Sequence, residues 1–241
     1  MEYRLNFFIA IISSIGGLVG SLFTLWLFFR GGNNLAGWQW NEAMLIMAMF
    51  TLMQGASRMF LTPNLGQLVE LVQMGTFDFV LLKPFDTQLW ISIRNISPWG
   101  VPDLLLGLAL IGFAGYSLEF GPVNYLLGVI PVLLASVLLY SIWFILATTS
   151  IWFVKVSNVT HVLQSFLEAG RFPIAAYPGL MRFFFTFICP VAFLTTVPAD
   201  AMLQRLDMRW ILGSVALALT LFIFSRLFFR FALRFYTSAS S

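Results

Sequence analysis

Apolar residues gather along this chain in six long runs, and short polar segments separate one run from the next. The runs are approximately Phe7–Phe29, Ala43–Leu61, Gly100–Leu118, Tyr125–Val154, Leu180–Val197 and Trp210–Phe229. A helix that crosses the hydrocarbon core of a bilayer needs about 20 predominantly apolar residues. The pattern therefore predicts an all-α membrane protein with six transmembrane helices.

Two of the six runs differ from an average span. The run 125–154 is long for a core about 30 Å thick, so we expect this helix to tilt or to extend into the cytoplasm. Pro190 interrupts the run 180–197, and a proline inside a spanning helix usually kinks the helix rather than ending it. We therefore expect the fifth span to be kinked.

The positions of Lys and Arg predict the orientation of the chain, because cytoplasmic loops carry an excess of these residues. With the N-terminus inside, the inner side receives ten of the 13 basic residues and the outer side receives three. The inner residues are Arg4, Arg58, Lys83, Arg94, Lys155, Arg171, Arg182, Arg226, Arg230 and Arg234, and the outer ones are Arg30, Arg205 and Arg209. Both termini are therefore expected in the cytoplasm.

The longer of two predicted cytoplasmic segments, 62–98, contains the pattern of an amphipathic helix. Its polar face carries Gln67, Glu70 and Gln73, and its apolar face carries Leu65, Leu68, Val69 and Val72. A helix of this kind lies along a membrane or against a partner. We expect Gly75 to end it. Asp78 is placed to cap a short turn that starts at Phe79 and ends at Pro84.

The second predicted cytoplasmic segment, 157–179, shows a similar pattern. Its apolar positions are Val159, Val162, Leu163, Phe166 and Leu167, and its polar positions are Asn158, His161, Gln164, Ser165 and Glu168. Ser157 is a plausible N-cap, and Gly170 is a plausible C-terminal stop. We expect a second amphipathic helix outside the membrane.

The composition also favours a membrane protein. Of 241 residues, 60% are hydrophobic and 10% are charged, and the mean hydropathy is +0.90. A soluble domain carries about 25% charged residues, so this chain has too little polar surface to cover one globular core. We expect a single polytopic domain over residues 1–241, without a soluble catalytic domain. The formal net charge of +3 is too small to indicate a nucleic-acid partner.

Residue types that carry catalysis or bind metals are scarce. His161 and Cys189 are the only histidine and the only cysteine, so the chain holds no HExxH motif and no intrachain disulfide. It also has no Walker A sequence, which excludes a P-loop ATPase on this chain. We expect no catalytic residue, cofactor or metal site here. Asp103 and Arg182 lie near span ends, where we expect both to reach water as interfacial anchors.

Small residues recur at intervals of four in the first run. They form two series, Ser13, Gly17 and Ser21 in one and Gly16 and Gly20 in the other. This spacing places small side chains on one face of a helix and lets another backbone approach closely. The face is equally compatible with packing inside the chain and with a subunit interface.

Three stretches resemble the ABC-2 family of exporter permeases, in the branch long known as a domain of unknown function. The stretches are Gly37-Trp38-Gln39-Trp40-Asn41-Glu42, then Gly75-Thr76-Phe77-Asp78-Phe79-Val80-Leu81-Leu82-Lys83-Pro84, and a tail with Tyr177-Pro178, Pro190-Val191-Ala192-Phe193, Pro198 and Arg234-Phe235-Tyr236. The second stretch is the most specific match. The resemblance covers nearly the whole chain, in order. Relatives carry an interfacial elbow helix before the first span, and here only about six residues precede that span.

The resemblance implies a half-size, type V exporter subunit in the bacterial cytoplasmic (inner) membrane. Such a permease pairs with a second copy or with a related permease, and with two copies of a separate ABC ATPase that binds ATP and Mg²⁺. The segment 62–98 would couple to the ATPase through Gln67, Glu70, Gln73, Gly75, Asp78, Lys83 and Pro84. The first and fifth spans would meet at the dimer interface, which would give Ser13, Gly16, Gly17, Gly20 and Ser21 their role. The apolar spans suit export of a hydrophobic or amphipathic substrate.

Two other classes of function remain open from the residues alone. One is an intramembrane enzyme, such as a lipid-modifying enzyme, and the other is a channel or assembly scaffold without ATP coupling. Loss of function on substituting His161 or Asp103 in an intact fold would favour the enzyme. Function without any ATPase would favour the channel or scaffold.

Overall fold

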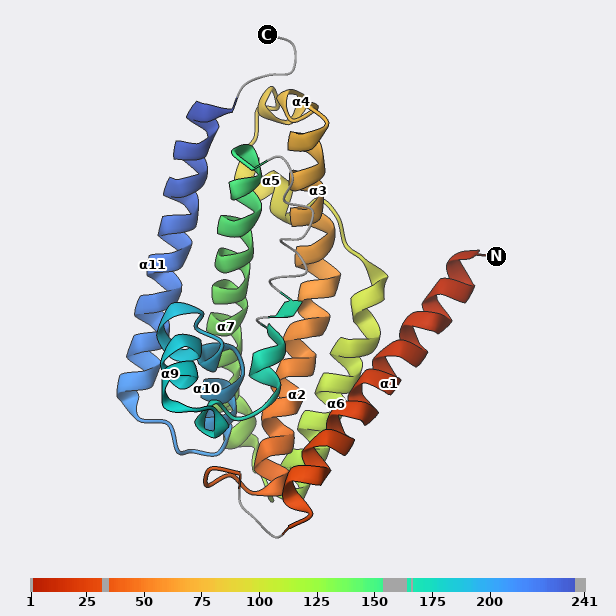
Figure 1. The fold of residues 1–241 in the computed structure, drawn as a ribbon, viewed down its shortest axis with the longest axis vertical. Helices are drawn as coiled ribbons and strands as arrows, with labels where there is room; N and C mark the ends of the chain where they lie inside the picture. Colours follow the sequence, from red (N-terminus) through yellow and green to blue (C-terminus); the bar gives the residue numbers. More distant parts are fainter. Residues whose placement is uncertain (1, 32–34, 154–163, 166, 237–241) are drawn as a thin grey trace.

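The computed structural model describes residues 2–31, 35–153, 164–165 and 167–236, and within these ranges the chain is helical without a β-strand. The helices stack side by side in an elongated bundle (Figure 1). The long ones are α1 (Glu2–Phe29), α2 (Trp40–Ala56), α6 (Val101–Ser117), α7 (Pro122–Thr148) and α11 (Met208–Ala232). Five helical segments in the described ranges are long and apolar enough to cross a membrane, and a bent pair of helices raises this number to six.

The shorter elements connect these helices. They are η1 (Ser57–Leu61), α3 (Thr62–Gln73), α4 (Asp78–Leu81), α5 (Thr87–Ile93), η2 (Pro98–Gly100), η3 (Thr149–Ile151), η4 (Ala169–Arg171), η5 (Ile174–Ala176), α9 (Gly179–Phe183), η6 (Phe184–Ile188), α10 (Ala192–Met202) and η7 (Leu233–Phe235). We name the two ends of the bundle by what they carry. The loop end carries α4, α5 and the end of α11, and the hairpin end carries the end of α1, the start of α2 and the α6–α7 connection (Figure 1).

Helix α2 continues through the π-helical turn η1 into α3. The continuous segment Trp40–Gln73 has 34 residues, which is about 51 Å of helix at 1.5 Å per residue. A hydrocarbon core is about 30 Å thick. The α3 end of this segment therefore projects beyond the core at the loop end.

Glycines bring the backbones of α2 and α6 into direct contact. A Cβ atom added at Gly55 would lie 2.5 Å from the backbone nitrogen of Leu104, and one added at Gly107 would lie 2.7 Å from that of Leu52. A Cβ at Gly100 would lie 2.4 Å from the carbonyl oxygen of Gly55. Helices in membranes associate closely where small residues meet, so these glycines make α2 and α6 one packed unit.

The segment before α11 differs from the sequence-based prediction. The predicted fifth span is two helical pieces, Gly179–Ile188 and Ala192–Met202, bent by 93° at the break. Pro190 lacks an N–H group, and Cys189 leaves helical geometry with φ −113° and ψ 89°. The proline therefore ends one helix rather than kinking a continuous one. Both pieces lie toward the hairpin end (Figure 1).

The described part of the predicted cytoplasmic helix in 157–179 is helical and ends near Gly170 as predicted, but it packs against the bundle instead of lying apart from it. Gly170 is buried inside η4, where an added Cβ would lie 2.7 Å from Cγ1 of Val191 on the segment leading into α10. The guanidinium of Arg171 lies over the ring of Phe50, near the middle of α2. The proposed N-cap Ser157 and His161 lie outside the described residues.

Candidate functional site

Helix α3 ends at the loop end as the sequence predicts. Gly75 adopts φ +67°, in the left-handed region that glycine enters without a Cβ clash. The N–H of Gly75 donates to the carbonyl of Val72, and the N–H of Thr76 donates to that of Leu71. These two hydrogen bonds form a Schellman motif. Gly75 therefore reverses the chain into the next turn.

The two faces of α3 have different partners from those predicted. Leu65 and Leu68 are 2% and 0% exposed and belong to the core of the bundle, so the prediction that this face contacts the ATPase or the membrane is wrong for both. Gln67 accepts a hydrogen bond from the Asn95 side chain at 2.7 Å. Glu70, together with Gln73, is exposed.

The exposed apolar surface lies beyond α3, on the turn that contains α4. We call it the apolar tip, and it consists of Met74, Phe79, Leu82 and Phe85, which are 64%, 70%, 81% and 68% exposed. Pro84 beside it is also exposed. Because α3 projects past the thickness of a hydrocarbon core, lipid tails do not explain this surface. Exposed apolar patches outside a membrane mark interaction sites.

The apolar tip is held in place by a buried aromatic residue that the sequence reading did not single out. Phe77 is 0% exposed, and its ring packs edge-on against Tyr236 with centroids 5.4 Å apart and against Phe229 at 6.5 Å. The tip therefore rests on the C-terminal turns of the chain.

The neighbouring Asp78 contributes to the same contact. The structure begins α4 at Asp78 with Phe77 as the N-cap, so the predicted capping role of Asp78 is displaced by one residue. Burial and, after it, the negative charge of Asp78 raise the pKa of Tyr236. The carboxylate of Asp78 therefore lies close enough to the hydroxyl of Tyr236 to influence it electrostatically.

The start of α5 is fixed to α11 by an ion pair. Asp86 caps α5 by accepting a hydrogen bond from the N–H of Leu89 at 3.0 Å. Its carboxylate also accepts two hydrogen bonds from the guanidinium of Arg226, one of them at 3.0 Å. The hydrogen bond from Arg226, followed by that from Leu89, lowers the pKa of Asp86 to about 2.

Further polar contacts tie α5 to the bundle. The side chain of Gln88 is buried and donates to the hydroxyl of Tyr140 on α7 at 3.1 Å. Lys83 and Arg94 both lie over the ring of Trp90, with Nζ 3.9 Å and Cζ 4.5 Å from its centroid. Cation–π contacts of this kind hold long side chains against an aromatic face. Lys83 is thus an exposed cation whose position Trp90 restricts.

The motif that opens α2 closes the opposite, hairpin end. Gly37 has φ +92°, and Trp38 is buried. The Glu42 carboxylate accepts a hydrogen bond from the N–H of Gln39 and pairs with Arg205 in the α10–α11 connection. This motif has a structural role, since it joins the start of α2 to the α10–α11 connection.

The five small residues of α1 divide between two faces. Ser21 is buried and donates to the carbonyl of Gly17, and Ser13 and Gly17 line a cavity against α2. Gly16 and Gly20 are exposed, and a Cβ added at either position would meet nothing within 4 Å. Gly17 is exposed as well, and a Cβ added there would also meet nothing within 4 Å, so Gly16, Gly17 and Gly20 are all open to a helix from another subunit.

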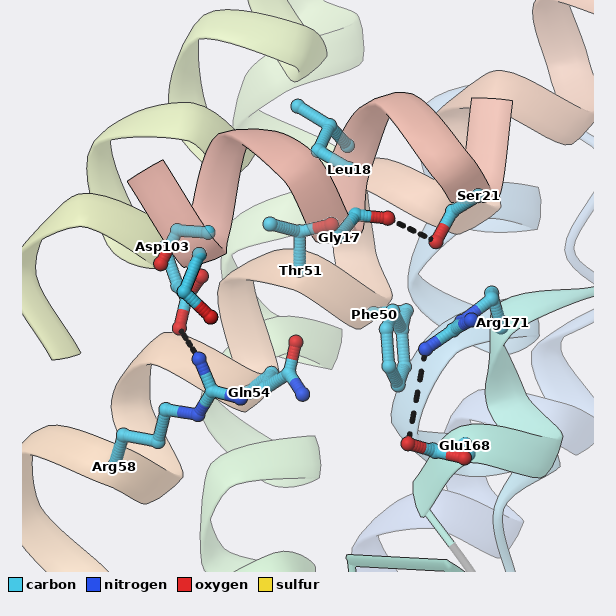
Figure 2. A pocket seen from close by; sticks show the side chains of 12 residues that line it. Gly17, Leu18, Ser21, Phe50, Thr51, Gln54, Arg58, Asp103, Glu168 and Arg171 are labelled. Atoms are coloured by element: carbon cyan, nitrogen blue, oxygen red, sulfur yellow. Dashed lines mark hydrogen bonds and ion pairs between the residues drawn. The ribbon is translucent and has the colours of Figure 1, made fainter. Parts of the chain in front are cut away.

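The cavity between α1, α2 and η4 is polar and has a volume of about 160 Å³. Figure 2 shows its lining, with Arg58 and Arg171 approaching from opposite sides of Gln54 and Phe50. A more open groove of about 540 Å³ shares Ser13, Ser14 and Arg58 with it and extends to Asn6 and Trp99.

Asp103 lies in the wall of this cavity rather than in water. It is 3% exposed, and its Oδ2 accepts a hydrogen bond from Nη1 of Arg58 at 2.6 Å. The expectation of an interfacial anchor is therefore wrong for Asp103. Burial of an unpaired carboxylate would cost several kcal/mol, so Arg58 compensates for its position.

A second pair of charges lies deeper in the bundle. Nη2 of Arg171 is 3.8 Å from Oε1 of Glu168, and Cζ of Arg171 is 5.0 Å from the ring centroid of Phe50. Phe50 is about 15 Å along α2 from Trp40 at 1.5 Å per residue, which is half the thickness of a hydrocarbon core. If the hydrocarbon core begins at Trp40, Arg171 lies near its middle, where an ionised side chain costs about 2.5–3.5 kcal/mol and is a functional-site candidate by default. The sequence reading missed this pair because it placed 157–179 outside the membrane.

The described residues hold no group of three or more His, Cys, Asp or Glu side chains that is placed to bind a metal ion. Cys189 is a half-buried free thiol. The catalytic alternative that depended on His161 concerns a position outside the described ranges.

These features define the class of the protein. Apolar helices long enough to span a bilayer, packed through glycine contacts, make it a multi-pass membrane protein. The family model described as "ABC-2 family transporter protein" matches residues 15–240, and the chain belongs to that family. It is therefore a transport permease. Neither the curated proteins nor the solved structures contain a match.

Proposed function

We propose that this chain is the membrane subunit of an ATP-driven exporter, and that its apolar tip binds a separate ABC ATPase. The permeases of this family work with an ABC ATPase in a lipid bilayer. In this proposal two ATPase subunits serve two permeases, which are identical copies or related chains. The cargo is hydrophobic or amphipathic, and the membrane is the bacterial cytoplasmic membrane.

The observation that carries the proposal is the apolar tip. Phe79 and Leu82 are 70% and 81% exposed at the loop end, while the adjacent Phe77 is fully buried. A turn that is anchored on one side and apolar on the other suits insertion into a groove of a partner protein. Glu70, Asp78 and Lys83 provide a polar rim around it, which is typical of interfaces.

Two structural connections join the apolar tip to the membrane-spanning helices. One is the continuous segment Trp40–Gln73, which carries α3 directly into α2. The other runs from Asp86 to Arg226, which connects α5 to α11. Movement of the ATPase subunits would be transmitted through both as rigid-body motion of helices.

The distribution of charge supports a cytoplasmic loop end. Arg182 lines a cavity with Arg205 near the hairpin end, and Arg171 lies at mid-depth, so both leave the predicted inner group. Lys83, Arg94, Arg226 and Arg230 keep the excess at the loop end. By the positive-inside rule, this distribution favours a cytoplasmic loop end.

The outward face of α1 suits the contact with the second permease. Gly16 and Gly20 lie one turn apart and are open to approach by another backbone. Close helix approach at such residues drives association in membranes. Ser21, which faces the bundle of its own chain, takes no part in this proposed interface.

Purification from native membranes in mild detergent tests the proposal. The double substitution Phe79→Ser with Leu82→Ser should reduce the co-purified ATPase at least tenfold, because each large apolar side chain contributes about 1.5–3 kcal/mol on burial. The control is Leu180→Ser with Phe183→Ser, which alters another exposed apolar pair, 84% and 55% exposed, on α9 toward the other end and should leave the ATPase bound.

The proposal is wrong if the unaltered protein carries no ATPase under conditions that preserve other ABC complexes. It also fails if both double variants reduce the bound ATPase equally. Export without any ATPase would instead support a channel or scaffold.

A further inference from the structure

The polar cavity in Figure 2 is a built space inside the apolar part of the bundle. Its wall includes Thr51 and Gln54 of α2 and the serines of α1. The open groove beside it leads from the cavity toward Asn6 and Trp99. A polar molecule is therefore able to enter from the loop end while it remains between helices.

The two arginines of the cavity retain hydrogen-bond donors for a ligand. A guanidinium has five N–H donors, and Asp103 accepts a hydrogen bond from only one nitrogen of Arg58. The Arg58 side chain is 38% exposed. The Nε–H of Arg171 is buried and has no acceptor among the described residues. Planar guanidinium groups bind carboxylate and phosphate groups in particular.

The carboxylates of the cavity leave room for an anion. Asp103 is buried and already paired with Arg58, so it does not compete with an anionic ligand for the remaining N–H donors of the cavity. Glu168 is 58% exposed and lies 3.8 Å from Arg171, which is a loose contact. An incoming anion is thus able to replace Glu168 as the partner of Arg171.

The lipid side of the cavity is a thin wall. Helix α1 leans away from the bundle toward its N-terminus (Figure 1), and Gly17 in the wall has no side chain. An apolar tail is therefore able to remain in the bilayer beside α1 while a headgroup occupies the cavity. This arrangement fits an amphiphile better than a fully water-soluble anion.

We propose that the cavity between α1, α2 and η4 binds the anionic headgroup of an amphiphilic cargo, through Arg171 and Arg58. This inference rests on the proposed function, because it names the chemical class of the exported substrate. Glu168 holds Arg171 in the empty site and is displaced when the headgroup binds.

Binding to the permease–ATPase complex in nanodiscs tests the site. The probes are fluorescent phosphatidic acid and diacylglycerol with identical acyl chains, so that only the phosphate differs. We expect phosphatidic acid to bind at least tenfold more tightly, and Arg171→Gln to remove this preference, since hydrogen bonds to charged groups are the strong ones. The control Arg209→Gln alters a side chain that is 91% exposed and should change nothing.

The variant Glu168→Gln separates binding from misfolding. Loss of the competing carboxylate should strengthen phosphatidic acid binding about threefold or more, and a damaged fold does not produce a gain. Equal binding of the two probes overturns the headgroup site, as does an equal effect of Arg171→Gln and Arg209→Gln. Displacement of phosphatidic acid by millimolar inorganic phosphate overturns the requirement for a tail.

The ATPase content of the same particles distinguishes this inference from the proposed function. Particles that retain the ATPase but show no headgroup preference contradict the cavity site alone. Particles that show the preference but lack an ATPase contradict the proposed exporter alone.

Discussion

The carboxylate of Asp86 and the guanidinium of Arg226 meet side by side, across 140 positions of sequence, and join the first turn of α5 to α11. Asp86 also caps its own helix through Leu89. One side chain thus fixes both the start of a helix and its attachment to a membrane span. The pair is the most direct connection between the loop that follows the apolar tip and the last span.

The contribution of the Asp86–Arg226 pair to stability should not change with pH between pH 5 and pH 8. The folded state holds the pKa of Asp86 at about 2, below the ordinary value of 3.8. A depressed carboxyl pKa stabilises the fold at pH values above the ordinary pKa, and the effect is lost as the pH falls toward the lower one. The difference in thermal midpoint between the wild type and Asp86→Asn should therefore stay constant from pH 5 to pH 8. A difference that changes within that range would contradict this assignment.

Substitutions at Asp86 should separate the ion pair from the helix cap. Asn caps a helix about as well as Asp, so Asp86→Asn removes mainly the ion pair, which is worth about 0.5–1 kcal/mol for a partly exposed pair. Asp86→Ala should cost about 1 kcal/mol more, because the cap is lost too. The measurement is thermal unfolding in detergent, with Arg226→Gln as the companion that removes only the pair.

Two glycines of α6 should respond in opposite ways to the same change. A methyl group at Gly107 meets the backbone of Leu52, whereas one at Gly112 meets nothing within 4 Å. Gly107→Ala should destabilise the protein by about 1–3 kcal/mol, since overpacking shifts the backbone. Gly112→Ala should be neutral or stabilising by up to about 1 kcal/mol, because alanine favours a helix. Equal effects on the thermal midpoint would contradict the close α2–α6 contact.

Cysteine cross-linking should distinguish the two faces of α1. In a Cys189→Ser background, Gly20→Cys should form a disulfide-linked dimer in native membranes under mild oxidation, because this position is exposed. The adjacent Ser21→Cys should not, since Ser21 is 5% exposed and faces its own bundle. Cross-linking at Ser21 alone would place the interface on the other face of α1.

Gly75 should matter through its backbone conformation. Its φ of +67° disfavours a residue with a Cβ, so Gly75→Ala should cost about 1 kcal/mol. Gly75→Asn should cost less, because Asn tolerates the left-handed region. We expect the ratio of bound ATPase to permease to be highest in the wild type, lower in Gly75→Asn and lowest in Gly75→Ala. A ratio unaffected by Gly75→Ala would show that the tip does not depend on this turn.

Local patterns were sufficient to predict the five long apolar helical segments and the end of α3. Apolar runs of about 20 residues indicate spanning helices from their length and composition alone, and Gly75 shows its role through glycine's access to the left-handed region. Neither inference needs a tertiary contact. These are the features that sequence reading recovers.

The errors arose where a pattern has two physical explanations. A polar helical face suggests contact with bulk water, but Glu168 lines a polar cavity between helices instead. An apolar face such as that of Leu65 and Leu68 is satisfied equally well by the chain's own core. Asp103 at a span end is compatible with water or with a distant arginine. Only the three-dimensional contacts decide among these.

The glycines also show that regular spacing in the sequence does not identify the closest contacts between helices. The regular series in the first run draws attention to Gly16 and Gly20, yet among the described glycines an added Cβ comes closest to another backbone at Gly55, Gly100 and Gly107. Those three have no common interval in the sequence. Their importance comes from the partner backbone, which a single sequence does not reveal.

The glycine contacts between α2 and α6 have a consequence for how motion is distributed in the protein. Where two backbones touch directly, no flexible side chains lie between them to absorb sliding, so the two helices change position only together. A force on the apolar tip would turn this pair as a single body. The polar cavity lies between that body and the loosely held α1, so the turn would change the width of the cavity.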